Sequence, residues 1–129
     1  MNLDVLIFAA HPDDAELSMG GTIAAFTSSG ITTGIIDFTE AELSTRGTIE
    51  SRRKETELAS SILNLTTREN LGLPDGELKP VKEFVQIAVS KIREYKPKIV
   101  FAPYFNDRHP DHIGAAQIVK EASFLSGLK

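Results

Sequence analysis

All three histidines of the chain lie in two short acidic segments that are far apart in the sequence. The first segment reads Ala10-His11-Pro12-Asp13-Asp14-Ala15-Glu16, and the second reads Asp107-Arg108-His109-Pro110-Asp111-His112. Each segment places imidazole beside carboxylate directly after an apolar run. Imidazole and carboxylate are zinc ligands, and the remaining groups can act as acids or bases. The two segments together therefore predict a metal site with catalytic groups around it.

The predicted metal ligands are His11, Asp14 and His112. A catalytic zinc ion commonly takes three protein ligands and keeps a fourth position open, and two histidines with one carboxylate suit that requirement. Asp13 is placed to act as a general base beside this set. The alternative interpretation is that Asp13 and Asp14 cap the helix that follows, where carboxylates are favoured. For a single aspartate the two interpretations are comparable, but the clustered histidines favour the metal site.

In the second segment, His109 and Asp111 are interpreted as an oriented imidazole–carboxylate pair. A carboxylate partner fixes the tautomer of a neutral histidine, which can then protonate a leaving amine or stabilise an oxyanion. The alternative is that His109 is a loop residue and that Asp111 caps the last helix. The two roles of Asp111 are compatible.

The composition limits the classes of function. The chain has 129 residues, which suggests a single domain, and it has no cysteine, so a metal site must use histidine and carboxylate. The net charge of −4 and the dispersed basic residues argue against a nucleic-acid partner. The N-terminus lacks the basic start of a signal peptide, and the apolar run Val5–Ala10 is too short to cross a bilayer. We therefore expect a cytoplasmic protein with no membrane insertion.

The pattern of apolar residues predicts strands alternating with helices. The expected strands are Val5–Ala10, Ile31–Phe38, Arg68–Leu73 and Ile99–Ala102, and the expected helices are Leu17–Ser29, Glu50–Leu63, Pro80–Tyr95 and His112–Leu125. This order predicts an α/β fold with a doubly wound, mainly parallel sheet of about four strands. In the strand order 3-2-1-4 the first and fourth strands are neighbours, so both histidine segments would meet at their carboxyl ends.

Three further signals are weaker. The Gly20-Gly21-Thr22 patch lacks the spacing of a phosphate-binding loop, so close packing of helix on sheet is the expected reason for it. The charge run Arg52 to Glu55 is typical of a solvated helix face. Glu40 follows the second strand at the same sheet edge as the histidines, so it is a weak candidate for a substrate contact.

Taken together, the motifs resemble the PIG-L/LmbE-like de-N-acetylases over essentially the whole chain. The supporting segments, besides the two histidine segments, are Gly20-Gly21-Thr22, Arg46-Gly47-Thr48, Asn70 to Gly76 and Phe101-Ala102-Pro103. The resemblance implies a Rossmann-like three-layer αβα domain that uses Zn²⁺, or another divalent metal, to remove acetyl groups from N-acetylglucosamine conjugates.

Carried over position by position, the resemblance gives the same metal ligands, with Asp13 as general base. It makes His109, held by Asp111, the acid or the oxyanion stabiliser, and it makes Arg52 a substrate-binding residue.

Two departures refine the expectation. Ala15 separates Asp14 from Glu16, and together with Thr39 to Ser44 this resembles the branch that deacetylates N-acetylglucosaminyl-malate in bacillithiol biosynthesis. Other N-acetylglucosaminyl glycolipids and chitooligosaccharides are the alternative substrates. Family members are longer, so residues 1–129 are expected to be the N-terminal part of the domain. That expectation favours a homo-oligomer, and it leaves a catalytically incomplete metal- or sugar-binding module as the rival hypothesis.

Overall fold

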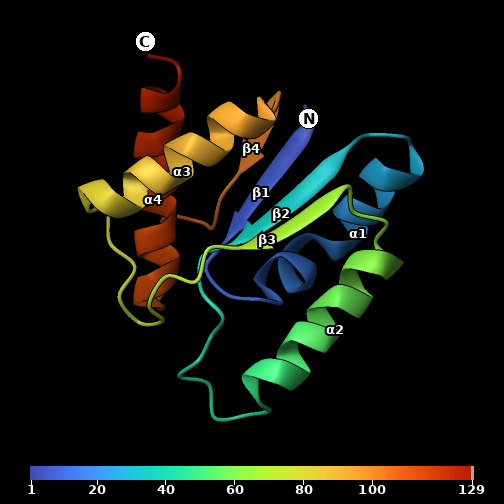
Figure 1. Cartoon of the computed structure of the whole chain (residues 1–129), viewed down its shortest axis with the longest axis horizontal. Coiled ribbons are helices and arrows are strands. Elements are labelled where there is room, and N and C mark those ends of the chain that lie inside the picture. The colour runs from blue at the N-terminus through green and yellow to red at the C-terminus, as the bar shows by residue number, and fades with distance from the viewer. Residues whose placement is uncertain (129) are drawn as a thin grey trace.

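A computed structural model of the chain describes residues 1–128, in which four strands alternate with four helices (Figure 1). The strands are β1 (Val5–Ala9), β2 (Thr33–Asp37), β3 (Thr67–Asn70) and β4 (Ile99–Phe101). The helices are α1 (Asp14–Ser28), α2 (Ile49–Ile62), α3 (Lys82–Tyr95) and α4 (Pro110–Ser126). None of these helices is both long enough and apolar enough to span a membrane. The predicted alternation of elements is confirmed.

The strands form one parallel sheet in the order β3-β2-β1-β4. In the register of the sheet, Val5 of β1 lies opposite both Thr33 of β2 and Ile99 of β4. Every residue of β1 and β2 is buried, as expected for central parallel strands that are covered on both faces. The predicted doubly wound sheet is therefore confirmed, and the carboxyl ends of β1 and β4 lie side by side.

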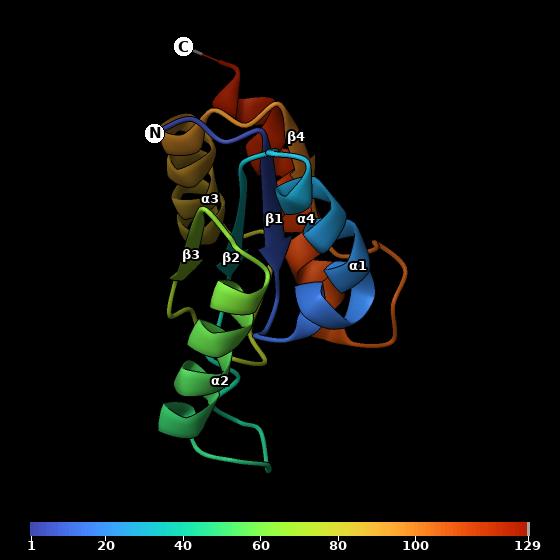
Figure 2. The ribbon, with the colours of Figure 1, turned by 90° about the vertical axis from the view of Figure 1, so that its right-hand side faces the viewer.

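Alternate side chains of β1 enter the two halves of the core. Leu6 and Phe8 point to the face that α3 and α4 cover, whereas Val5 and Ile7 point to the face that α1 covers. Figure 2 shows α1 and α2 on one side of the sheet and α3 on the other. This arrangement is the three-layer αβα architecture that the sequence predicts.

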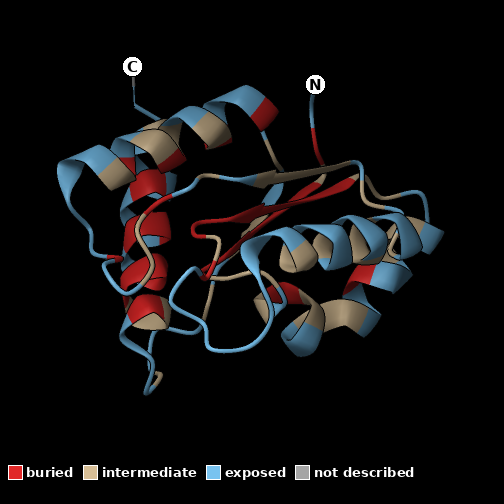
Figure 3. Cartoon of the chain, turned by 60° about the horizontal axis from the view of Figure 1, so that its bottom comes forward, coloured by how far each residue is buried: buried red, intermediate tan, exposed pale blue. Residues whose placement is uncertain are grey.

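Helix α2 lies at the surface, because α1 already covers β1 and β2 on that face of the sheet. No residue of α2 is buried (Figure 3). The apolar residues Leu58 and Ile62 are 64% and 75% exposed. The helix begins with a capping box, in which Thr48 and Ser51 bond each other's backbone N–H groups. The helical spacing is thus confirmed, although its apolar positions do not reach the core.

Helix α1 differs most from its prediction. It begins at Asp14 instead of Leu17, and it is kinked at Met19, whose φ of −145° is not helical. The expectation that Gly20 and Gly21 allow close packing is wrong for the described residues, because a Cβ added at either glycine would meet no atom within 4 Å. Because of the kink at Met19, the first turn of α1 is a separate short unit, and this unit carries Asp14.

Candidate metal centre

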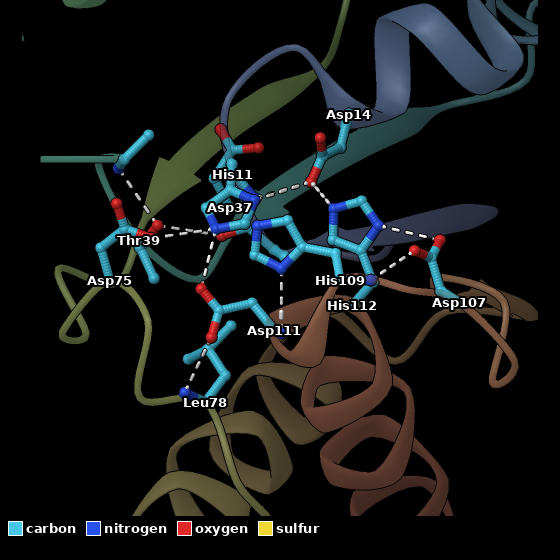
Figure 4. Close-up of polar contacts among 12 residues, drawn as sticks. His11, Asp14, Asp37, Thr39, Asp75, Leu78, Asp107, His109, Asp111 and His112 are labelled. Atoms are coloured by element: carbon cyan, nitrogen blue, oxygen red, sulfur yellow. Dashed lines mark hydrogen bonds and ion pairs between the residues drawn. The ribbon is translucent and has the colours of Figure 1, made fainter. Parts of the chain in front are cut away.

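The two histidine segments meet at the carboxyl edge of the sheet (Figure 4). His11 follows β1, whereas His109 and His112 lie at the start of α4, which follows β4. The ring centroid of His11 lies 4.9 Å from that of His109 and 5.6 Å from that of His112. Because β1 and β4 are neighbours in the sheet, the predicted convergence of the segments is confirmed.

Asp14 lies between His11 and His112. Its Oδ2 atom is 3.3 Å from Nδ1 of His11 and 3.1 Å from Nε2 of His112. The three side chains offer one ligand atom each, and these atoms all lie within 4.8 Å of one another. Two imidazole nitrogens and one carboxylate oxygen that converge in this way fit a divalent metal such as zinc.

The second ring nitrogen of each of these histidines contacts another carboxylate. Nε2 of His11 lies 2.9 Å from Asp111 and 3.0 Å from Asp75, and Nδ1 of His112 lies 3.2 Å from Asp107 (Figure 4). A ring N–H that donates to carboxylate leaves the opposite nitrogen with a free lone pair. This is the outer arrangement that orients metal-binding histidines in proteins. The residues present therefore fit a bound metal by chemistry as well as by distance.

Asp111 serves His11 and not His109, which corrects the predicted pair. Its carboxylate is buried and accepts hydrogen bonds from the backbone N–H groups of Gly76 (2.8 Å) and Leu78 (3.1 Å). His109 is the N-cap of α4, and its Nδ1 accepts the backbone N–H of Asp111 at 3.1 Å. The ring of His109 thus bonds the backbone of Asp111, whereas the carboxylate of Asp111 contacts the ring of His11.

A second group, His11, His109 and Asp111, also brings three ligand atoms within 4.8 Å of one another. In this group, however, the carboxylate of Asp111 already accepts two backbone N–H groups and the ring of His11. Nδ1 of His109 is occupied as well. In the first group, by contrast, one carboxylate oxygen of Asp14 faces a ring nitrogen of both His11 and His112, and we carry this group forward as the proposed metal site.

Asp13 is exposed and has a left-handed backbone, with φ of 83° and ψ of −23°. This conformation costs a residue other than glycine about 1–3 kcal/mol and is found where the surroundings enforce it. Asp13 occupies the N-cap position of α1, but its side chain makes no capping hydrogen bond. Asp14 instead accepts the backbone N–H of His11 at 3.0 Å. The cap interpretation is therefore wrong for Asp13, whose carboxylate stays free beside the ligand set.

The donor set carries a strong local field. Burial opposes protonation of His11, but hydrogen bonds to Asp14 and Asp111 and the charge of Asp75 outweigh it and raise the pKa of His11 to about 9. Burial also opposes ionisation of Asp111, but the N–H of Gly76 and the ring of His11 outweigh it and hold the pKa of Asp111 below its usual value. The site is thus built to hold positive charge among its carboxylates.

The family described as PIG-L, GlcNAc-PI de-N-acetylase, matches residues 6–123. This chain belongs to the PIG-L family. The match includes both histidine segments and every strand except the first residue of β1.

Relatives of this PIG-L chain include two curated proteins. Diacetylchitobiose deacetylase of Thermococcus kodakarensis is 33% identical, and the alignment covers 96% of this chain and 50% of that protein. Probable N-acetyl-alpha-D-glucosaminyl L-malate deacetylase 2 of Bacillus anthracis is 28% identical, with 92% of this chain and 58% of that protein covered. The chain thus spans about half the length of the curated relatives that it matches.

Among solved structures, the conserved protein TT1542 of Thermus thermophilus has the same fold. Its TM-score is 0.95 at 46% identity, and the match covers 98% of this PIG-L chain and 58% of that one. The fold predicted from the sequence is therefore the fold of a solved relative.

The structure separates the two substrate-binding candidates. Arg52 lines a hollow of about 450 Å³ together with His11, Asp13, Asp14 and His109. Its Nη2 donates to Ser44 and its Nε to the carbonyl of Arg46. Glu40 forms a bidentate pair with Arg53 (2.7 and 2.9 Å) and lines a neighbouring cavity of about 420 Å³. Arg52 thus lies at the edge of the metal centre, whereas Glu40 does not.

Two carboxylates of the centre were not assigned a role from the sequence. Asp75 is interpretable from sequence only as part of a Pro-Asp-Gly turn, yet it contacts His11 and also accepts the N–H of Leu43 at 3.0 Å. Asp107 stands inside the second histidine segment and accepts the N–H of His109 at 2.8 Å. The position of Asp107 two residues before His109 is the sequence signal that could have identified it. For Asp75 the sequence offered no comparable signal, because its partner lies on a distant strand end.

Proposed function

We propose that this chain carries the catalytic centre of a zinc-dependent N-deacetylase that hydrolyses the acetamide of a small N-acetylglucosamine conjugate. The observation that carries the proposal is the group of His11, Asp14 and His112, with the free carboxylate of Asp13 beside it. Membership of the PIG-L family supports the same activity. The reaction breaks the amide C–N bond and yields acetate and a free amine.

His11, Asp14 and His112 would hold the zinc ion, with Asp75, Asp107 and Asp111 orienting the two histidines. When bound, zinc would supply Lewis-acid polarisation of the acetyl carbonyl and would lower the pKa of a water molecule toward about 7.

Asp13 acts as the general base in this proposal. Its carboxylate lines the hollow and makes no capping hydrogen bond, so it is available to accept a proton from the attacking water.

His109 acts as the hydrogen-bond or proton donor in this proposal. Because its Nδ1 accepts the backbone N–H of Asp111, the neutral ring carries its hydrogen on Nε2. That N–H is then available to stabilise the developing oxyanion or to serve the departing amine. The tautomer of His109 is thus set by the backbone of α4 and not by a carboxylate.

For the substrate, we propose N-acetylglucosaminyl-malate first and diacetylchitobiose second. The segment Thr39–Ser44 favours the former, and the name of the Bacillus anthracis relative supports it. The name of the Thermococcus kodakarensis relative favours the latter. Arg52 would contact the sugar at the edge of the hollow, and Glu40, in the neighbouring cavity, would meet the aglycone.

The test is acetate release from both substrates by zinc-replete protein and by chelator-treated protein. We expect release that depends on zinc, with one substrate preferred. Absence of acetate from both substrates, with zinc bound, would contradict the proposed activity of this chain.

A second candidate function is a module that binds metal or sugar without turnover. It is favoured by the internal pairing of both substrate-binding candidates, since Arg52 bonds Ser44 and the carbonyl of Arg46, and Glu40 bonds Arg53. Zinc analysis beside the acetate assay, on the same chain, discriminates the two functions. Stoichiometric zinc with no acetate would favour the module, whereas zinc-dependent acetate release would exclude it.

A further inference from the structure

Arg68 of β3 lies in a charged cluster that the proposed chemistry does not use. Its guanidinium forms two hydrogen bonds with Asp37 (2.9 and 3.2 Å) and two with Glu16 (3.2 and 3.3 Å). The side chains of Arg68, Asp37 and Glu16 are only 10%, 1% and 16% exposed. A buried ion pair adds little net stability compared with apolar side chains, but in some proteins it specifies how the elements that carry it are positioned. The cluster therefore indicates that the segments carrying these three side chains must be held in fixed positions.

The cluster joins the two pieces of chain that bring the metal ligands together. Asp37 is the last residue of β2 and lies opposite Ala9 of β1, two residues before His11. Glu16 lies in the first turn of α1, two residues after Asp14. The guanidinium of Arg68 thus ties the turn that carries Asp14 to the edge of the sheet that carries His11.

Apart from the contacts of Asp14 with His11 and His112, the first turn of α1 has few attachments to the protein. It begins after the left-handed residue Asp13 and is separated from the rest of the helix by the kink at Met19. The buried residues of α1 are Ala15 and Ile23, and only Ala15 lies in the first turn. A strained backbone persists only where its surroundings hold it in place. The contact of Glu16 with Arg68 is a side-chain bond that can do so.

We propose that Arg68 is a positioning residue of the metal centre, which through Glu16 and Asp37 holds the Asp13–Asp14 turn in register with His11 and His112. This inference rests on the proposed function for the role of Asp13 and Asp14. Arg68 is not one of the proposed metal ligands and does not line the hollow of Arg52 and Asp13, although it lines the neighbouring cavity beside Glu40, so the test uses readouts that need no substrate.

The test compares three variants with the wild-type chain. Glu16→Ala removes the bond to α1 but leaves the buried pair of Arg68 and Asp37 intact, so it is expected to fold. Arg68→Lys keeps the charge but cannot bond both carboxylates through a planar fork. Lys91→Met is the matched control, because Lys91 bonds Glu69, the neighbour of Arg68 in β3, on the side of α3.

The first readout is amide hydrogen exchange in the metal-free chain, which depends on neither zinc nor turnover. The N–H of Leu17 donates to the carbonyl of Asp13 at 2.8 Å and reports on the first turn of α1. We expect loss of protection at Leu17 in Glu16→Ala and in Arg68→Lys, and wild-type protection in Lys91→Met. Unchanged protection in both cluster variants would overturn the proposal.

The second readout is Co²⁺ affinity together with the visible absorption spectrum of the Co²⁺-loaded chain. We expect both cluster variants to bind Co²⁺ roughly 10- to 100-fold more weakly, with an altered spectrum, as for other residues that orient ligands. Wild-type affinity and spectrum in both cluster variants would show a purely structural role and would overturn the proposal.

Failure of the proposed function has a different signature from failure of this inference. A wild-type chain that binds Co²⁺ but releases no acetate would contradict the deacetylase activity. Hydrogen exchange and Co²⁺ binding would still test the positioning role of Arg68. A wild-type chain that binds no Co²⁺ would contradict the metal centre itself, and the positioning role with it.

Discussion

The buried carboxylate of Asp111 lies 2.9 Å from Nε2 of His11, although the two residues are 100 positions apart in the sequence. Asp111 lies in the first turn of α4, and His11 follows β1. When His11 is neutral, as metal binding requires, this contact places the ring hydrogen on Nε2 and leaves the lone pair of Nδ1 facing Asp14. The metal centre is thus specified by the junction of two distant segments.

Asp111→Asn tests this junction. The amide keeps an oxygen for one backbone N–H but loses the charge that holds His11. We expect zinc affinity to fall by roughly 10- to 100-fold, the range found when a partner of a metal-binding histidine is lost. Competition with a chromophoric chelator measures the change. If Asp111 acted through His109 instead, zinc affinity would stay at the wild-type value and only turnover would fall.

Asp13→Asn separates catalysis from metal binding. Because Asp13 is exposed and makes no capping hydrogen bond, the variant should keep its zinc and its fold. Loss of a general base is expected to lower turnover by roughly 10²–10⁴-fold. Acetate release and zinc content are measured on the same samples. A parallel loss of zinc and activity would make Asp13 a ligand and not a base.

The raised pKa of His11 predicts how the metal-free chain responds to pH. The folded state keeps the proton up to about pH 9, whereas the usual pKa of histidine is 6.5. Its stabilising contribution is therefore fully present below pH 6.5 and is lost as the pH rises toward 9. Zinc must displace this proton, so apparent zinc affinity should increase with pH across the same window.

Calorimetric titration in buffers of different ionisation enthalpy measures the proton that is released on zinc binding. We expect proton release at about pH 7 that declines toward pH 9. Zinc binding with no proton release at neutral pH would contradict the charged state of His11.

Strand β4 forms one edge of the described sheet, and apolar side chains are exposed along and after it. Ile99 is 51% exposed, and Tyr104 and Phe105 in the following loop are 65% and 70% exposed. An uncovered parallel edge with apolar neighbours favours pairing with another chain. We expect the chain to self-associate at micromolar concentration and Ile99→Lys to weaken that association.

Sedimentation velocity measures the association, and Leu58→Lys on the exposed face of α2 is the matched control. A wild-type chain that sediments as a monomer would contradict the prediction. Equal weakening by both variants would indicate nonspecific association through any apolar side chain.

The sheet and the convergence of the two histidine segments could be predicted because both follow from local patterns. The apolar run of β1 and the β-branched residues of β2 indicate buried parallel strands, and parallel strands bring their carboxyl ends to one edge. His11 follows the end of β1, and His112 lies in the first turn of α4, which the loop after β4 leads into. Their convergence therefore required only the strand order, which the alternation of elements predicts.

The partners of the histidines could not be predicted, because they depend on how loops and helix ends are turned. Asp111 lies nearer to His109 in sequence, yet the ring of His109 accepts the backbone N–H of Asp111 while the Asp111 carboxylate contacts His11. Helix α4 approaches the loop at Leu78 closely, and this places the carboxylate of Asp111 beside the ring of His11. A Cβ on Gly114 would lie 1.9 Å from the carbonyl oxygen of Leu78, so only glycine permits that approach.

The central claim is that His11, Asp14 and His112 hold a single divalent metal ion, and zinc stoichiometry in two histidine variants tests it most directly. The rings of His112 and His109 stack at 4.8 Å, so His109→Ala is a matched control for His112→Ala. We predict stoichiometric zinc in the wild-type chain and in His109→Ala, and its loss in His112→Ala, because two remaining protein ligands rarely hold zinc. Full zinc occupancy in His112→Ala, with loss in His109→Ala, would contradict the claim and place the metal between His11, His109 and Asp111.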